Sequence, residues 1–162
     1  MSSITLFGAG SWGTALSVHL ASSGRDVTLW ARRSEVVEEI RRTSYNPTYL
    51  PELLIPSSVS ITTDLETAAE ASDFWGMAVP SQNVRDRVEA LRPFASEDVT
   101  AVALSKGIEN ETLLTMSQVL DEVLEGVPSR QIGVLYGPSH AEEVAEGRPT
   151  TVVAAAPEKE EA

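Results

Sequence analysis

The feature that most constrains this chain is a glycine-rich turn near its start. Residues 8–13, Gly-Ala-Gly-Ser-Trp-Gly, fit the pattern G-x-G-x-x-G and stand between an apolar strand pattern and an amphipathic helical one. In that context each glycine has a physical role. Gly8 allows the tight turn, Gly10 lets a pyrophosphate approach the backbone, and Gly13 lets helix and strand pack closely. The N–H groups and dipole at the helix start would bind the phosphates, so we expect a dinucleotide site.

A glycine turn without a ligand is the alternative interpretation of the same segment. Three glycines at these spacings are costly to keep merely as a turn, because each loses more backbone entropy on folding than any other residue. We therefore favour the dinucleotide interpretation.

Strand and helix patterns alternate along the rest of the chain. The strand patterns are continuous apolar runs, as a parallel sheet covered on both faces requires. The predicted fold class is therefore α/β, a doubly wound (Rossmann) and mostly parallel sheet with helices on both faces, over residues 1–156, followed by a charged tail at 157–162. Strands are expected at 4–7, 26–31, 61–62, 73–79, 99–105, 132–136 and 150–156, and helices at 14–23, 35–42, 64–71, 81–91, 111–124 and 139–145.

Composition excludes several classes of function. The 24 acidic and 12 basic residues give a net charge of -12, which disfavours nucleic acid and anionic membrane surfaces as partners. The absence of cysteine excludes disulfides, thiol nucleophiles and thiolate metal sites. No apolar run approaches the ~18–20 residues that span a bilayer. Because the N-terminus also lacks a basic segment and a cleavage site, we expect a cytoplasmic protein.

The end of the second predicted strand bears on the choice between NADP and NAD. An acid there would bind the ribose 2′-hydroxyl of NAD, whereas arginine favours the 2′-phosphate of NADP. Here Trp30-Ala31 is followed by Arg32 and Arg33, with no acid before Glu35. We favour recognition of NADP(H) by these guanidinium groups, and NAD stays open. Alternatively, both arginines only solvate a helix start.

Four further segments stand out together with the glycine turn. They are NPTYLP at 46–51, AVPSQ at 78–82, SKGIE at 105–109 and GPSHAEEVA at 137–145. With these segments in this order, the chain resembles, over nearly its whole length, the N-terminal domain of bacterial-type NAD(P)-dependent glycerol-3-phosphate dehydrogenase. The resemblance implies hydride transfer between NAD(P)H and dihydroxyacetone phosphate, giving sn-glycerol 3-phosphate for phospholipid synthesis.

The resemblance also implies roles for individual positions. Besides the glycines of the turn, it implies cofactor contacts for Ser11, Trp12, Arg32, Arg33, Tyr49, Lys106 and Ala141. Substrate contacts are implied for Lys106, Gly137 and Ser139.

Elementary chemistry supports two of these assignments. Reduction of a ketone develops negative charge on its oxygen, so a cation or a hydrogen-bond donor must lie near it. Lys106 follows an apolar strand at the carboxyl edge of the sheet, where ligands of such folds bind. Gly137-Pro138-Ser139 opens a helix at the same edge and suits a phosphate or carbonyl oxygen. A solvated lysine and an N-cap serine are the alternatives, and the N-cap role is compatible with binding.

Four residues depart from the family or invite a second interpretation. His140 stands where the family usually has an aromatic residue, and we expect a core substitution in preference to a change in the pocket. Trp75-Gly76 is an awkward pair for a central buried strand. His19 is expected to be an ordinary histidine on the face of the first helix.

The family continues into a helical C-terminal domain that carries the catalytic lysine. The only lysines here are Lys106 and Lys159, and Lys159 lies in the acidic tail. We therefore expect a shortened chain with no catalytic residue of its own, which binds dinucleotide but catalyses the reaction weakly or not at all. The face that the second domain normally covers would be exposed, which favours association, for example as a homodimer. Two alternatives stay open: a 2-hydroxyacid or nucleotide-sugar dehydrogenase, and a non-catalytic NAD(P)-binding or redox-sensing module.

Overall fold

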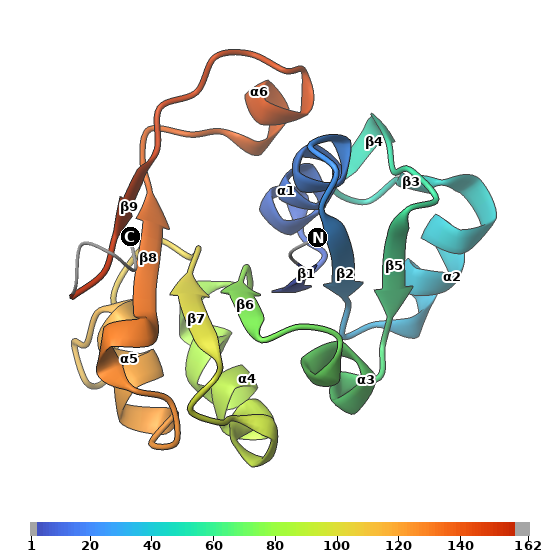
Figure 1. Ribbon diagram of the computed structural model, residues 1–162. Helices are drawn as coiled ribbons and strands as arrows, with labels where there is room; N and C mark the ends of the chain where they lie inside the picture. The colour runs from blue at the N-terminus through green and yellow to red at the C-terminus, as the bar shows by residue number, and fades with distance from the viewer. Residues whose placement is uncertain (1–2, 158–162) are drawn as a thin grey trace.

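A seven-stranded sheet forms the centre of the computed structural model, which describes residues 3–157 (Figure 1). The strands follow the order β5-β2-β1-β6-β7-β8-β9, and every neighbouring pair is parallel except β8 and β9. This arrangement confirms the predicted doubly wound, mostly parallel fold. The strands are β1 (Ser3–Phe7), β2 (Asp26–Trp30), β5 (Val59–Thr62), β6 (Phe74–Met77), β7 (Thr100–Ala103), β8 (Ile132–Tyr136) and β9 (Val153–Ala155).

Helices cover both faces of the sheet because successive strand residues point to opposite sides. On one face, Leu6 and Leu29 pack against α1 and α2; on the other, Phe7 and Trp30 pack in a core with α3, α4 and α5. The helices are α1 (Ser11–Ser22), α2 (Ser34–Thr43), α3 (Leu65–Glu70), α4 (Val84–Leu91), α5 (Met116–Val123) and α6 (Ala141–Ala145), with short 3₁₀ turns η1 (Ser81–Asn83), η2 (Arg92–Phe94) and η3 (Ser129–Gln131).

Two segments differ from the sequence expectations. The helix predicted over 111–124 begins only at Met116, since Leu113 adopts a left-handed backbone (φ 59°) and residues 111–115 form a loop. Thr115 caps the helix, with the Gln118 side chain accepting its backbone N–H at 2.9 Å. The segment expected only to interrupt the chain after α2 forms a small antiparallel hairpin of β3 (Tyr45–Asn46) and β4 (Leu50–Leu54).

The unusual pair Trp75-Gly76 fits the central strand β6 for a physical reason. Trp75 is buried, its Nε1–H donates to the Ser72 carbonyl at 2.8 Å, and its ring meets Phe7 edge-on at 5.7 Å between centroids. A Cβ on Gly76 would lie 2.6 Å from Leu6 Cδ2 and 2.9 Å from Leu104 Cδ1. The glycine thus leaves room for two leucines of the opposite core.

Among residues 3–157, no helix combines the length and the apolar character needed to cross a membrane. The predicted domain end at 156 lies just after β9, and most of the predicted tail, including Lys159, lies outside the described residues. The division at 156 stays a prediction.

Candidate functional site

A cleft of about 620 Å³ opens at the carboxyl ends of β1, β2, β6 and β7. It lies where the strand order reverses on either side of β1, which is where open α/β sheets bind their ligands. Its lining brings together residues from the glycine turn, the end of β2, the starts of η1 and α4, the end of β7 and the start of α6. Of the predicted site residues, the lining includes Gly8, Gly10, Ser11, Trp12, Arg32, Arg33, Tyr49, Lys106, Ser139 and Ala141.

The three glycines of residues 8–13 occupy different environments. Gly8 has a φ of 129°, and its N–H donates to the Trp30 carbonyl at 3.0 Å. A Cβ on Gly13 would lie 1.8 Å from the Gly8 carbonyl oxygen, so this glycine lets α1 start against the turn. A Cβ on Gly10 would meet no atom within 4 Å. Gly10 therefore leaves open space above the backbone, where a pyrophosphate fits.

The amino terminus of α1 suits an anion. Gly10 is its N-cap, no side chain caps the first turn, and that turn holds no acidic residue. The first N–H groups of a helix lack intrahelical partners, and the helix dipole favours negative charge beside them. Ser11 and Trp12 lie in this turn and line the cleft. The residues present thus fit a dinucleotide phosphate, whereas no group of three potential metal ligands occurs within the described part of the chain.

Asn46 holds the glycine turn in place and was missed by sequence reasoning. This side chain on β3 is 1 % exposed, and its Nδ2 donates to the Ala9 carbonyl at 3.0 Å and to Thr14 Oγ1 at 2.9 Å. The sequence indicated a family segment at 46–51 but gave no sign that its first residue reaches residue 9. The hairpin therefore supports the turn from outside the strand–helix unit.

Arginines gather at the end of β2. Arg33 Nη2 donates to Tyr49 Oη at 3.2 Å, with the guanidinium 5.9 Å from the centre of the Tyr49 ring. Arg87 of α4 was not expected here, and its guanidinium lies 4.3 Å from the centre of the Trp30 ring. Burial, followed by the nearby charge of Arg32, lowers the pKa of Arg87.

Lys106 and Ser139 come together at the other end of the cleft. Lys106 Nζ donates to the Ser139 carbonyl at 3.2 Å and lies 3.3 Å from Ser139 Oγ. Gly137 is not among the described residues that line the cleft. A Cβ there would lie 2.4 Å from the Thr151 carbonyl oxygen, so close packing requires a glycine, and its predicted substrate contact stays a prediction.

The core interpretation of His140 is wrong. His140 is exposed, precedes α6 as its N-cap and lines the cleft, because the chain turns outward before the helix. The next residue, Ala141, is the buried one, and it packs with Ala15 of α1 and Leu50 of β4. His19 is exposed on α1, as expected of an ordinary helix-face histidine.

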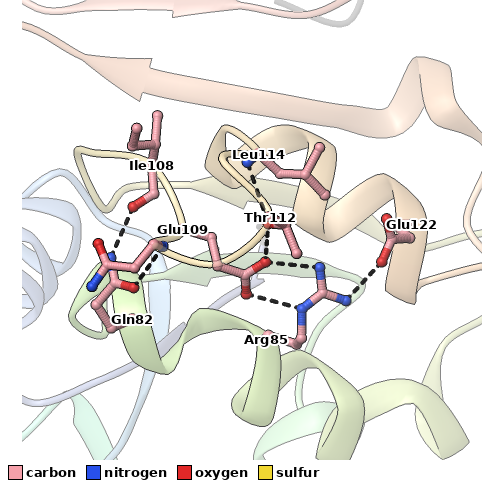
Figure 2. A network of polar contacts seen from close by, with 8 residues as sticks. Gln82, Arg85, Ile108, Glu109, Thr112, Leu114 and Glu122 are labelled. Atoms are coloured by element: carbon pink, nitrogen blue, oxygen red, sulfur yellow. Dashed lines mark hydrogen bonds and ion pairs between the residues drawn. The ribbon is translucent and has the colours of Figure 1, made fainter.

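A polar network anchors the loop that follows Lys106 (Figure 2). Arg85 of α4 binds both carboxylate oxygens of Glu109, at 2.9 and 3.0 Å, and donates to Glu122 of α5 at 2.8 Å. Gln82 donates to the Ile108 carbonyl at 2.8 Å and accepts the Asn110 N–H at 3.0 Å. The loop is thereby fixed to η1, α4 and α5.

Glu109 is expected to stabilise the fold only while it is ionised. Hydrogen bonds from Arg85, and then from Thr112, hold the pKa of the Glu109 carboxyl below its ordinary value of 4.5. A pKa lowered by folding contributes stability above the unfolded value, and that stability is lost as the pH falls through the folded value. At neutral pH we expect Glu109→Gln to lower the Tm by roughly 2–4 °C, measured by thermal unfolding.

The Tm difference between wild type and Glu109→Gln should shrink once the pH falls below about 4.5. Glu111→Gln, which changes an exposed carboxylate in the same loop, is the matched control and should have little effect at either pH. An undiminished Tm difference in acid would contradict the ionic role of Glu109.

The sequence comparisons with known proteins indicate one family. The sequence model described as NAD-dependent glycerol-3-phosphate dehydrogenase N-terminus matches residues 3–162. A Salinibacter ruber protein named glycerol-3-phosphate dehydrogenase [NAD(P)+] 1 is 82% identical over 162 residues, 100% of this chain and 48% of the relative. A Chlorobium phaeobacteroides protein named glycerol-3-phosphate dehydrogenase [NAD(P)+] is 46% identical over 94% of this chain and 46% of the relative.

Solved structures give the same result. The crystal structure of glycerol-3-phosphate dehydrogenase from Coxiella burnetii superposes with a TM-score of 0.89 at 31% identity, over 98% of this chain and 48% of that one. A Plasmodium falciparum structure of the same name has a TM-score of 0.86 at 20% identity, over 98% of this chain and 46% of that one, and supports the fold alone. The chain spans about half the length of the curated relatives it matches. It belongs to the NAD-dependent glycerol-3-phosphate dehydrogenase family and matches the N-terminal part of that family.

Proposed function

We propose that this chain is the dinucleotide-binding part of an oxidoreductase that transfers a hydride between NAD(P)H and dihydroxyacetone phosphate or sn-glycerol 3-phosphate. One observation carries the proposal: a single cleft has an open glycine turn at a helix start near its middle and the Lys106–Ser139 pair at one end. The printed names of the relatives support the substrate and cofactor classes.

In this proposal the two ends of the cleft have different tasks. Gly8, Gly10, Ser11, Trp12 and Gly13 form the pyrophosphate site, with Arg32, Arg33 and Tyr49 on the adenosine side. Lys106 and Ala141 lie toward the nicotinamide, which supplies the hydride when bound. The residues of the substrate site are Lys106, Gly137 and Ser139.

Lys106 is the chemically important residue of the chain in this proposal. Its ammonium group would stabilise the negative charge that develops on the ketone oxygen, since a fixed cation needs little reorganisation in the transition state. Ser139 accepts hydrogen bonds from Nζ at the same end of the cleft and so orients the ammonium group. A supply of sn-glycerol 3-phosphate for phospholipid synthesis, a cytoplasmic location and association into a homodimer belong to the same proposal.

Calorimetric titration of the 162-residue chain with NADPH and NADH tests the cofactor site. We expect saturable binding of at least one dinucleotide. Gly10→Ala should lower the affinity by at least roughly tenfold, because its methyl group would fill the space needed by the pyrophosphate. The same variant should unfold within about 1 kcal/mol of wild type, because the added Cβ meets no neighbour and the backbone of Gly10 is one that alanine adopts. The poorer helix cap that alanine makes is offset by the lower conformational entropy of its unfolded chain.

A folded wild-type chain that binds neither dinucleotide would contradict the proposal. Its substrate part is tested by titrating the NADPH complex with dihydroxyacetone phosphate. Lys106→Met should weaken that second binding step while circular dichroism stays unchanged. Equal substrate binding by both forms would remove Lys106 from the proposed substrate site.

A further inference from the structure

Arg87 brings an additional cation to the adenosine side of the cleft. It comes from α4, more than fifty residues after β2, and its guanidinium lies over the ring of Trp30, the last residue of β2. Trp30 is held in turn by its Nε1–H, which donates to the Thr63 carbonyl at 2.9 Å. A guanidinium that lies over a fixed aromatic ring is held by the cation–π attraction, so this contact fixes the position of Arg87 at the end of β2.

The charge of Arg87 is not balanced by an ion pair among the described residues. Arg42, Arg85 and Arg148 each bind a glutamate within 3 Å. Among residues 3–157, no carboxylate lies within 4.0 Å of the Arg32 or Arg87 guanidinium, as is true of most arginines of the chain. Asp86 favours the charged form of Arg87 only from a greater distance.

The Nε atom of Arg87 is also left without a hydrogen-bond partner within the described part of the chain. This atom is buried, although burying an unbonded polar group is costly. The neighbouring charge of Arg32 adds repulsion. In a protein of net charge -12, two adjacent unpaired guanidinium groups lining a cleft therefore fit a ligand with more than one negative charge.

The position of the Arg32 and Arg87 guanidinium groups at the end of β2 indicates which part of a dinucleotide they would contact. The end of the second strand is where doubly wound folds bind the ribose 2′ position of a dinucleotide. Arg33 is turned to Tyr49, which leaves Arg32 and Arg87 beside Trp30. Resting on the function proposed above, we propose that Arg87 is a specificity-determining residue that binds the 2′-phosphate of NADP(H) together with Arg32. A phosphate monoester carries up to two negative charges at neutral pH and accepts forked hydrogen bonds from guanidinium groups.

Titration of wild type, Arg87→Gln and Arg87→Lys with NADPH, NADH, 2′,5′-ADP and 5′-ADP tests the proposal. Wild type should bind NADPH better than NADH, and 2′,5′-ADP better than 5′-ADP. Arg87→Gln should weaken binding of the two 2′-phosphorylated ligands by roughly ten- to a hundredfold and of the other two by less than about twofold. Arg87→Lys keeps the charge but loses the fork, so its loss should be smaller.

Arg92→Gln is the matched control, because Arg92 is an exposed arginine just after α4 and is not among the described residues that line the cleft. This control variant should leave the affinities for all four ligands unchanged.

Equally weakened binding of NADPH and NADH by Arg87→Gln would overturn the proposal, since it would mean a role in adenine binding or in packing on Trp30. Equal binding of both dinucleotides by wild type would also overturn it while leaving the proposed function intact. A wild-type chain that binds neither NADPH nor NADH would overturn both this proposal and the proposed function. If Arg87→Gln fails to fold, the proposal is tested by two other comparisons. Arg87→Lys should lose affinity for the 2′-phosphorylated ligands only, and wild type should bind NADPH better than NADH and 2′,5′-ADP better than 5′-ADP.

Discussion

Replacing Gly13 by alanine is expected to lower the free energy of unfolding by about 3 kcal/mol and to abolish dinucleotide binding. The new Cβ would lie 1.8 Å from the Gly8 carbonyl oxygen and 3.3 Å from the Ala78 Cβ. The first of these neighbours is backbone that cannot rotate away, so the glycine turn and the start of α1 must separate. Urea unfolding followed by circular dichroism measures the stability loss, and calorimetric titration with NADPH measures binding.

Gly10→Ala is the control for this effect, because it adds the same methyl group two residues from Gly8 in open space. The two variants should therefore differ: Gly10→Ala loses binding at nearly full stability, and Gly13→Ala loses both. A Gly13→Ala protein that unfolds at the wild-type urea concentration would show that the turn can yield at little cost.

Removal of the Trp75 side chain should have the largest effect on stability. Trp75 is 1 % exposed and packs in the core with Phe7. We expect Trp75→Ala to lower the free energy of unfolding by about 3–5 kcal/mol, since it leaves a large cavity and removes a buried aromatic contact. Chemical denaturation at equilibrium measures the loss.

Trp75→Phe separates the packing of the ring from its hydrogen bonds. It retains an aromatic ring beside Phe7 but loses the Nε1–H that donates to the carbonyls of Ser72 and Ala69. A cost of about 1–3 kcal/mol is expected, because the Ser72 carbonyl would lose its buried donor. If phenylalanine proved as destabilising as alanine, the hydrogen bonds and not the packing would account for the role of Trp75.

The sheet and most helices could be predicted because their signals are local. The strand pattern at residues 4–7 is short and mostly apolar and is followed directly by Gly8, and the glycine turn is a motif of only six consecutive residues. The segment 111–115 has an acidic and apolar composition compatible with a helix, but the Glu109–Arg85 contact and the left-handed Leu113 hold it in a loop. A contact with residue 85 leaves no periodic signal in residues 109–115.

In the candidate site, too, some residues could be predicted from local sequence signals and others could not. Residues 8–13, Arg32 and Lys106 stand at strand ends, where the fold class alone places ligands. Arg87 reaches the cleft, and Asn46 reaches the glycine turn, from elements far away in sequence. Nothing in their spacing distinguishes them from ordinary helix and turn residues. His140 was misplaced because the pattern of 137–145 does not reveal which residue begins the helix.

The contact between Asn46 and the glycine turn bears on the thermodynamics of association. A glycine-rich loop that is free to move must lose conformational entropy when it closes around phosphates, and that loss weakens binding. Here the amide of Asn46 donates hydrogen bonds to Ala9 and Thr14, so the turn is fixed by contacts within the fold itself. The turn thus loses its conformational entropy when the protein folds and not when the ligand binds. Phosphate contacts therefore contribute to the affinity with little entropic cost from ordering the turn.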